Sequence, residues 1–290
     1  MKRTKQLRPD NLPLYRYWHA LYMSFYSPSL YVDVAKRWRG WGFLYLWLAI
    51  AVGTMPLSAR IIFEFNQYFN QKILEPIKLL PPVYVQNGQV KFEKPMPYMI
   101  KNSKGEVVAI VDTTGAVDKI TSEYPQLSLL ITKNQIMYKP PKLEFLVNNT
   151  VPVEGDKVMV HDLNPHDNEV FQGTDWIKNN GVVRLKYITE LLVYPLIVIF
   201  FLGVFWSLIL LISILGQLIA RTFFDLKLTF SQTCRVMSVA ATPQMAFTFT
   251  TYTVNAVFGG LGLIMIALQS IYFGYAIIAI KRASMKIVHK

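Results

Sequence analysis

Residues 191–220 form an unbroken run of thirty residues without one charged side chain. About 20 mostly apolar residues cross a bilayer core as an α-helix, because only a helix satisfies every backbone N–H and C=O within the segment. The run exceeds that length, so we expect its helix to tilt or to project beyond the bilayer. A chain that carries this segment is constrained to be a membrane protein.

Three further stretches are apolar and long enough to cross as helices, at residues 41–59, 233–254 and 257–280. The stretch at 233–254 is the most polar, because Thr242, Pro243 and Gln244 lie near its middle, and we place it inside the helix bundle. The expected fold class is therefore an α-helical membrane protein with four transmembrane helices. A small α+β domain with a mainly antiparallel sheet is inserted between the first and second helices.

Positive charge is concentrated at the two ends of the chain. Residues 1–40 hold 8 Lys and Arg against 2 Asp and Glu, residues 191–290 hold 7 against 1, and residues 59–190 hold 15 of each. Because positive flanks stay on the cytoplasmic side, both termini are predicted to be cytoplasmic, in a bacterial inner membrane, with residues 61–188 periplasmic or extracellular. The charge-balanced middle region lacks the basic face of a nucleic-acid-binding module, so we expect no nucleic acid as a partner. The expected partner is the lipid bilayer.

The domain boundaries follow from these spans. Residues 1–40 are predicted to be a cytoplasmic amphipathic segment, 41–60 the first transmembrane helix, 61–188 the extracytoplasmic domain, and 189–290 the remaining three helices with a short cytoplasmic tail. Residues 12–26 combine many aromatic side chains with the basic Arg16 and His19, which suits the headgroup layer of a membrane. The same segment could instead dock beneath the bundle, and the two interpretations overlap.

The sequence of the extracytoplasmic domain predicts short strands separated by turns. Asn87-Gly88 stands between two β-prone runs, which is a strong hairpin signal because both turn residues need positive φ. Further strands are expected at 98–100, 107–111, 127–132, 135–139 and 158–160, and helices at 61–74, 116–124 and 167–180. Cys234 is the single cysteine, so no disulfide within the chain can hold this domain together.

Several blocks resemble a known family. The segment from Ser24 to Tyr31 (Ser-Phe-Tyr-Ser-Pro-Ser-Leu-Tyr) and the following block from Asp33 to Gly40, ahead of a span, look like the start of the bacterial membrane family called domain of unknown function 1189. The resemblance continues in the Asn87-Gly88 hairpin, in residues 112–115 and 130–134, and at Thr242-Pro243. It implies a multi-span bacterial membrane protein, similar to the wider Yip1-like group. Some members are labelled as serving maltodextrin utilisation, and the family supplies no catalytic residues to carry over.

Two polar groups in the domain are candidate sites. The first is the sequence Asp112-Thr113-Thr114-Gly115 after a strand, which could bind a cation or phosphate or could be a capped turn, and the capped turn is the favoured interpretation. The second group joins two histidines and two aspartates between 161 and 167. Its spacing fits no standard metal motif, so we expect a solvated loop, no metal and no cofactor.

The membrane region has its own candidate polar site, formed by Thr242, Pro243, Gln244 and Gln269. The two glutamines lie near the middle of antiparallel spans, where an unpaired amide is costly. We expect them to hydrogen-bond to each other or to Thr242, and Pro243 to bend its helix. Such a set acts either as structural glue or as a midplane binding site like those of transporters.

Gly-rich phosphate loops and the common hydrolase and zinc motifs are missing from the sequence, so we expect no enzyme activity. The favoured function is a non-catalytic scaffold, accessory or sensor that engages a protein partner or forms a homo-oligomer. The alternative is a transporter or transport accessory, for example for carbohydrate such as maltodextrin. A membrane enzyme acting on lipid or glycan ranks third.

Overall fold

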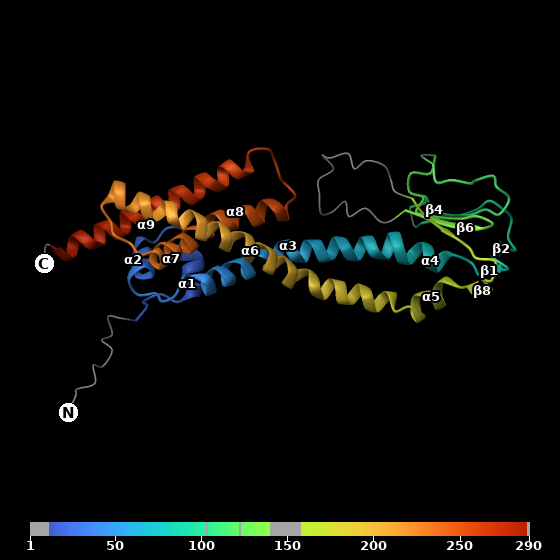
Figure 1. Ribbon diagram of the computed structural model, residues 1–290, viewed down its shortest axis with the longest axis horizontal. Helices are drawn as coiled ribbons and strands as arrows, with labels where there is room; N and C mark the ends of the chain where they lie inside the picture. Colours follow the sequence, from blue (N-terminus) through green and yellow to red (C-terminus); the bar gives the residue numbers. More distant parts are fainter. Residues whose placement is uncertain (1–11, 103, 122, 140–157, 289–290) are drawn as a thin grey trace, which may run out of the picture. The chain divides into compact units, whose positions relative to one another are not determined.

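A computed structural model describes residues 12–288 of the 290-residue chain, except for 103, 122 and 140–157. The chain divides into two units, which are treated separately. The helical unit comprises residues 1–60 and 193–290, and the sheet unit comprises Ile61–Leu192. Two helices, α3 (Phe43–Tyr68) and α6 (Val182–Phe224), contribute residues to both units (Figure 1).

In the described residues, three helices are long and apolar enough to cross a membrane: Phe43–Leu79, Val182–Phe224 and Leu261–Met285. Val182–Phe224 contains the expected span at 191–220, and the other two helices cover most of the expected spans at 41–59 and 257–280 but begin two and four residues later. The fourth expected span, 233–254, is instead two shorter helices, α7 (Phe230–Ala240) and α8 (Thr242–Thr253). Pro243 explains the division, because it lacks the N–H that would bond to the Val239 carbonyl and its ring crowds that turn. The structure therefore supports a membrane protein with three spanning helices of full length.

The core of the helical unit gathers α2 (Pro28–Lys36), α3, α6, α7 and α9 (Leu261–Val288). Helix α2 packs against α7 and α9, with Leu30, Tyr31 and Val34 completely buried. Most of α2 is thus docked within the unit. The preceding α1 (Tyr17–Met23) has an exposed face that includes Trp18 and Tyr22. Both interpretations of residues 12–26, anchoring in the headgroup layer and docking beneath the bundle, stay predictions.

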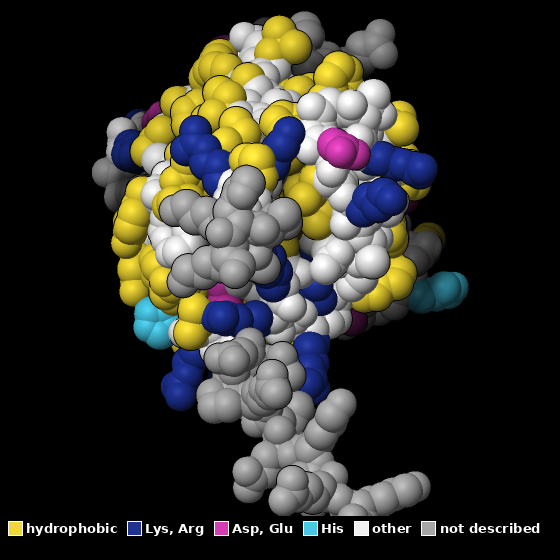
Figure 2. Space-filling model, turned by 90° about the vertical axis from the view of Figure 1, so that its left-hand side faces the viewer, with side chains coloured by type: hydrophobic (Ala, Val, Ile, Leu, Met, Phe, Trp, Pro, Cys, Tyr) yellow, Lys and Arg dark blue, Asp and Glu magenta, His cyan; other side chains and the backbone are white. Residues whose placement is uncertain are grey.

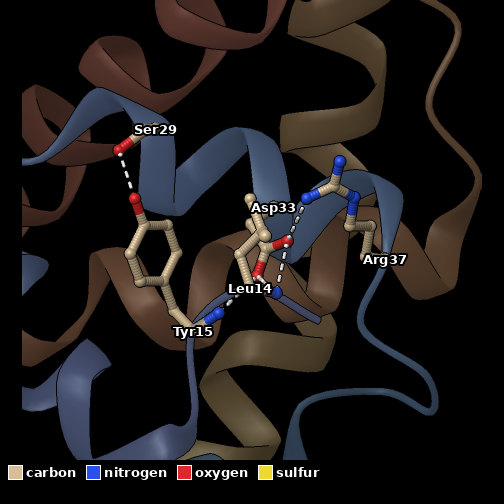
Figure 3. A network of polar contacts seen from close by, with 5 residues as sticks. All are labelled: Leu14, Tyr15, Ser29, Asp33 and Arg37. Carbon is tan, nitrogen blue, oxygen red and sulfur yellow. Dashed lines mark hydrogen bonds and ion pairs between the residues drawn. The ribbon is translucent and has the colours of Figure 1, made fainter. Parts of the chain in front are cut away.

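Asp33 joins the N-terminal segment to α2 (Figure 3). Its buried carboxylate accepts hydrogen bonds from the backbone N–H groups of Leu14 and Tyr15, each at 3.1 Å. Arg37, one turn further along, donates to the same carboxylate at 3.4 Å. A buried carboxylate needs such donors, since burial without them would be costly. These hydrogen bonds hold the backbone at Leu14 and Tyr15 against α2.

Lys and Arg side chains gather around one end of the helical unit, among hydrophobic side chains, and few acidic groups lie beside them (Figure 2). The exposed basic residues near the ends of the unit's helices are Lys36, Arg39, Arg221, Lys227 and Arg282. This end is therefore strongly positive.

The sheet unit contains two sheets. The three-stranded sheet has the order β2-β1-β8, and the five-stranded sheet has the order β3-β4-β5-β6-β7. All neighbouring strands are antiparallel except the parallel pair β4 and β5, which agrees with a mainly antiparallel α+β fold. The strands are β1 (Val83–Gln86), β2 (Gln89–Lys91), β3 (Tyr98–Lys101), β4 (Val107–Val111), β5 (Leu129–Ile131), β6 (Gln135–Tyr138), β7 (Met159–Asp162) and β8 (Glu169–Phe171).

The β1–β2 hairpin turns at Asn87 and Gly88, whose φ angles are +50° and +71°, as the sequence predicts. One apolar core joins the two sheets, and its members include Val83, Val85 and Val90 from the hairpin and Ile131 from β5. Strand β4 is buried almost throughout, which explains its uninterrupted apolar sequence.

Helical segments precede the first strand of the sheet unit and follow its last strand. The end of α3 continues into η2 (Phe69–Leu74), a π-helix, and then into α4 (Glu75–Leu79), which packs against α5 (Gly173–Asn179) (Figure 1). A polar network links this segment to the start of α6. The Asn66 amide donates to Glu190 at 2.9 Å, and the Lys186 ammonium donates to Asn70 at 3.1 Å. Helix at 61–74 was expected, and the structure confirms and extends it.

Two expectations for the sheet unit are wrong or incomplete. The helix expected at 116–124 is absent from the described residues of that range, which form bends and turns ending at Pro125. The Asp112 side chain holds the backbone N–H of Val117 and so directs this segment into a turn. The helix expected at 167–180 begins only at Gly173, because Glu169–Phe171 pairs with β1 as strand β8.

Candidate functional site

A cavity of about 1080 Å³ lies within the sheet unit. That volume slightly exceeds the usual range for small-molecule sites, about 300–1,000 Å³. Its walls come from the end of α3, from η2, α4 and α5, and from strands of both sheets. No residue of the helical unit contributes to the described lining.

Aliphatic side chains form much of the cavity wall. Val83 and Val85 alternate along β1 and so face the same side of the strand, and Val90 joins them from β2. Leu129 and Ile136 line the cavity from β5 and β6 and are only half-buried. The alternation of the strands therefore directs a continuous apolar surface toward the cavity.

Lys72 is the charged residue that the helical segments supply to the described lining. It lies in η2, is half-buried, and donates from Nζ to the side-chain oxygen of Gln126, which also lines the cavity. The π-helical character of η2 is visible in the bond from the Glu75 N–H to the Asn70 carbonyl, a five-residue step. Helices of this kind are rare and occur frequently at functional sites.

The other polar groups of the lining are largely engaged in structure. The Asp167 carboxylate accepts the Asn164 N–H at 2.8 Å, and Ser128 donates its hydroxyl to the Val108 carbonyl at 3.0 Å. His161 also lines the cavity, whereas Asp162, next in β7, accepts a hydrogen bond from Gln135. Among the described residues, no group of three or more His, Cys, Asp or Glu side chains could hold a metal ion.

The predicted site at Asp112 is a capped turn. Its carboxylate is fully buried and accepts the Thr114 N–H at 2.8 Å, the Thr114 hydroxyl at 2.5 Å and the Val117 N–H at 2.6 Å. Thr113 bonds to the sulfur of Met96, and Gly115 has φ of +86°. Burial raises the pKa of Asp112, but the hydrogen bonds from Thr114 and Val117 outweigh it and lower the pKa overall. The carboxylate oxygens are thus occupied by the chain's own donors.

The predicted polar set at 242–269 is buried, but its members bond differently from expectation. The Thr242 hydroxyl pairs with Tyr45 at 2.6 Å, and the Gln269 amide nitrogen donates to the Met237 carbonyl at 3.4 Å. The Gln269 side-chain oxygen has no partner within the described structure. Gln244 contributes its backbone carbonyl to Thr248, so the expected glutamine pair does not form. Pro243 marks the division between α7 and α8, as described above.

Sequence reasoning missed three features of the structure: the cavity, Lys72 and Arg235. The cavity depends on valines and isoleucines that read only as strand core, and Lys72 read only as part of a helical extension. A signal was present in the apolar spacing of residues 61–74, which continues past the span into a folded region. Arg235 was also missed. Its guanidinium is buried and donates to the carbonyls of Ala35 and Gly40, each at 3.2 Å.

Comparison with known proteins gives one result. The model of a family described as "Protein of unknown function (DUF1189)" matches residues 18–277, which is most of the chain. No curated protein and no solved structure matches the chain.

Proposed function

The chain belongs to the DUF1189 family, and we propose that it is a bacterial membrane protein that binds a ligand in its sheet unit without catalysing a reaction. It would act as a sensor or accessory that passes the bound state to a protein partner or to a second copy of itself. The observation that carries this proposal is the cavity of about 1080 Å³ with its largely aliphatic wall.

The proposed topology has four crossings, in the cytoplasmic membrane, with both termini cytoplasmic and the sheet unit outside. The three long helices supply three crossings, and α7 and α8 together supply the fourth as a divided helix. Buried hydrogen-bonding groups at the division, such as Thr242, suit a helix enclosed by others. The positive end of the helical unit supports its placement in the cytoplasm (Figure 2).

Thiol labelling tests this topology well, because the single native cysteine, Cys234, is buried. In a Cys234→Ala background, Lys104→Cys adds an exposed thiol to the sheet unit and Lys227→Cys adds one between α6 and α7. A membrane-impermeant maleimide should label Lys104→Cys in intact cells and Lys227→Cys only after permeabilisation. The reverse pattern would refute the proposed orientation.

Binding without catalysis is supported by the chemistry of the cavity wall. Ser128 commits its hydroxyl proton to a backbone carbonyl, so it is not activated as a nucleophile. The aliphatic surface can bury apolar ligand atoms but offers little to stabilise developing charge.

A cavity-filling substitution tests the binding proposal. Leu129→Trp adds bulk to the cavity wall, whereas Met99→Trp makes a similar change in β3, outside the cavity lining. Small molecules extracted from the full-length protein, purified in lipid nanodiscs, are compared by mass spectrometry. A species present in the wild type and in Met99→Trp should be lost from Leu129→Trp, and equal recovery from all three would refute cavity binding.

Transport is a second candidate, favoured by one observation. Helices α7 and α8 are divided at Pro243, and the Gln269 oxygen nearby in the bundle is buried without a partner. Transporters build midplane sites from divided helices of this kind. Gln269→Leu should abolish uptake of a transported solute while leaving the folded protein intact. If the Gln269→Leu protein instead retains its bound ligand at wild-type occupancy, the result would favour the first proposal, which is ligand binding in the sheet unit.

A further inference from the structure

The cavity wall restricts the class of ligand, given the proposed function on which this step rests. Ile73 and Ile77 from the helical segments and Leu129 and Ile136 from the five-stranded sheet are half-buried and offer only aliphatic surface to the cavity. A carbohydrate placed against them would lose the water that satisfies its hydroxyls without gaining partners. An acyl or alkyl chain, in contrast, gains from every methylene that leaves water. The wall therefore suits a ligand with a long apolar part.

Lys72 gives this apolar cavity a charged end. It is the charged residue that η2 adds to the lining, and it donates to the neutral side-chain oxygen of Gln126. A half-buried ammonium group with a neutral partner retains donors for an anion. The two acids of the lining, Asp167 and Glu169, come from a different segment, the one that leads into β8.

The backbone around Lys72 is itself unusual. Lys72 and Ile73, both in the lining, belong to the six-residue π-helix η2, and the bonding pattern returns to α-helical at Glu75. Wide helical turns of this type are rare and are found frequently at functional sites. Here the wide turn presents one charged and one apolar side chain to the same cavity.

We propose that the cavity of the sheet unit binds a single-chain amphiphile with an anionic headgroup. The apolar chain lies against the half-buried aliphatic side chains of the lining, and the headgroup accepts hydrogen bonds from the Lys72 ammonium group. A fatty acid carboxylate and a lysophospholipid phosphate share this chemistry, and the experiment below separates these two sources.

The test uses full-length protein in phosphatidylcholine nanodiscs and native mass spectrometry to titrate defined probes. Two probes are anionic, hexadecanoate and a lysophosphatidylglycerol with the same chain, and one is cationic, hexadecyltrimethylammonium. Maltotriose serves as the carbohydrate probe. Wild-type protein should bind at least one anionic probe at least about tenfold more tightly than the cationic one, and it should not bind maltotriose. Binding of hexadecanoate alone identifies a fatty acid, and binding of the lysolipid alone identifies a membrane lipid.

Matched variants locate the headgroup. Lys72→Gln should weaken the anionic probe at least about tenfold and leave the cationic probe unchanged, and Lys72→Arg should restore anion binding. Lys78→Gln, at an exposed lysine of α4 outside the lining, should change nothing. Retention of wild-type anion affinity in Lys72→Gln would overturn the inference.

The two proposals fail in different ways. If the cationic probe or maltotriose binds best and Leu129→Trp blocks it, the cavity binds a ligand but the anionic amphiphile is wrong. The proposed function itself is wrong if two results are found together: no probe binds, and the wild type yields no more of any co-purifying small molecule than Leu129→Trp does.

Discussion

The hydroxyl of Tyr45 lies 2.6 Å from Oγ1 of Thr242, and both side chains are buried. The bond joins α3 to the first residue of α8, next to the division that Pro243 creates. A hydroxyl at a divided helix would otherwise face apolar surroundings. This contact therefore ties the least regular helix of the bundle to one of its long spanning helices.

Removal of the Tyr45 hydroxyl should destabilise the helical unit. Tyr45→Phe leaves the Thr242 hydroxyl buried without its partner, which we expect to cost about 1 kcal/mol. The measurement is the free energy of unfolding in detergent micelles. A double-mutant cycle with Thr242→Val should show coupling between the two positions. Tyr22→Phe, at an exposed ring, is the control and should leave stability unchanged, and an equal loss in both tyrosine variants would contradict the assignment.

The Asp112 turn should make the sheet unit sensitive to acid. Because its pKa is lowered in the folded state, the unfolded state binds the proton more readily. The stabilisation is therefore complete above the unfolded pKa of about 3.9 and is lost as the pH falls through the lower folded value.

Asp112→Asn should reduce stability at pH 7 by about 1–3 kcal/mol, because an amide cannot accept all three hydrogen bonds. The thermal midpoint of this variant should also fall less than that of the wild type between pH 7 and pH 3, since the titrating group is gone. Asp118→Asn, at an exposed position nearby, is the control. A wild-type pH profile in Asp112→Asn would show that another group dominates.

Local patterns of the sequence were sufficient for much of the fold. The charge-free run at 191–220 identified a spanning helix, and Asn87-Gly88 identified a hairpin, because each depends on a short-range rule of hydrophobic length or backbone φ. The Asp112 turn was also predictable, since an Asp followed by a Gly three residues later caps itself locally.

Features that depend on distant residues could not be predicted in this way. Strand β8 exists because Val85 pairs with Glu169, far along the chain, and the polar sequence around Glu169 favours no strand by itself. Gln269 bonds to a backbone carbonyl of Met237 rather than to Gln244, a choice set by the packing of α7 against α9. The cavity likewise arises from the spacing of two sheets and four helical segments, which no single motif predicts.

Gly173 should tolerate no side chain. A Cβ atom there would lie 1.8 Å from the Ile77 carbonyl oxygen, so α4 and α5 would have to separate. Gly173→Ala should destabilise the sheet unit by about 1–3 kcal/mol through this overlap. It should also weaken ligand binding, because Ile77 and Trp176 line the cavity from these two helices. Gly203→Ala in α6 meets no atom within 4 Å and should be neutral or stabilising in a thermal melt, and similar losses in both variants would refute the steric argument.

The helical unit should require the planar guanidinium group of Arg235 and not only its positive charge. Its Nη1 group donates to the carbonyl of Gly40, in the link between α2 and α3, and its Nη2 group donates to the carbonyl of Ala35, in the last turn of α2. A lysine offers a compact point charge in place of the planar fork and cannot reach both carbonyls in this geometry. Arg235→Lys should therefore lower the free energy of unfolding by about 1–3 kcal/mol and increase proteolysis in residues 36–42.

Arg221→Lys, at an exposed position in the last turn of α6, is the control and should change stability by less than about 0.5 kcal/mol. Wild-type stability and protease resistance in Arg235→Lys would mean that the two carbonyls are satisfied without the guanidinium fork.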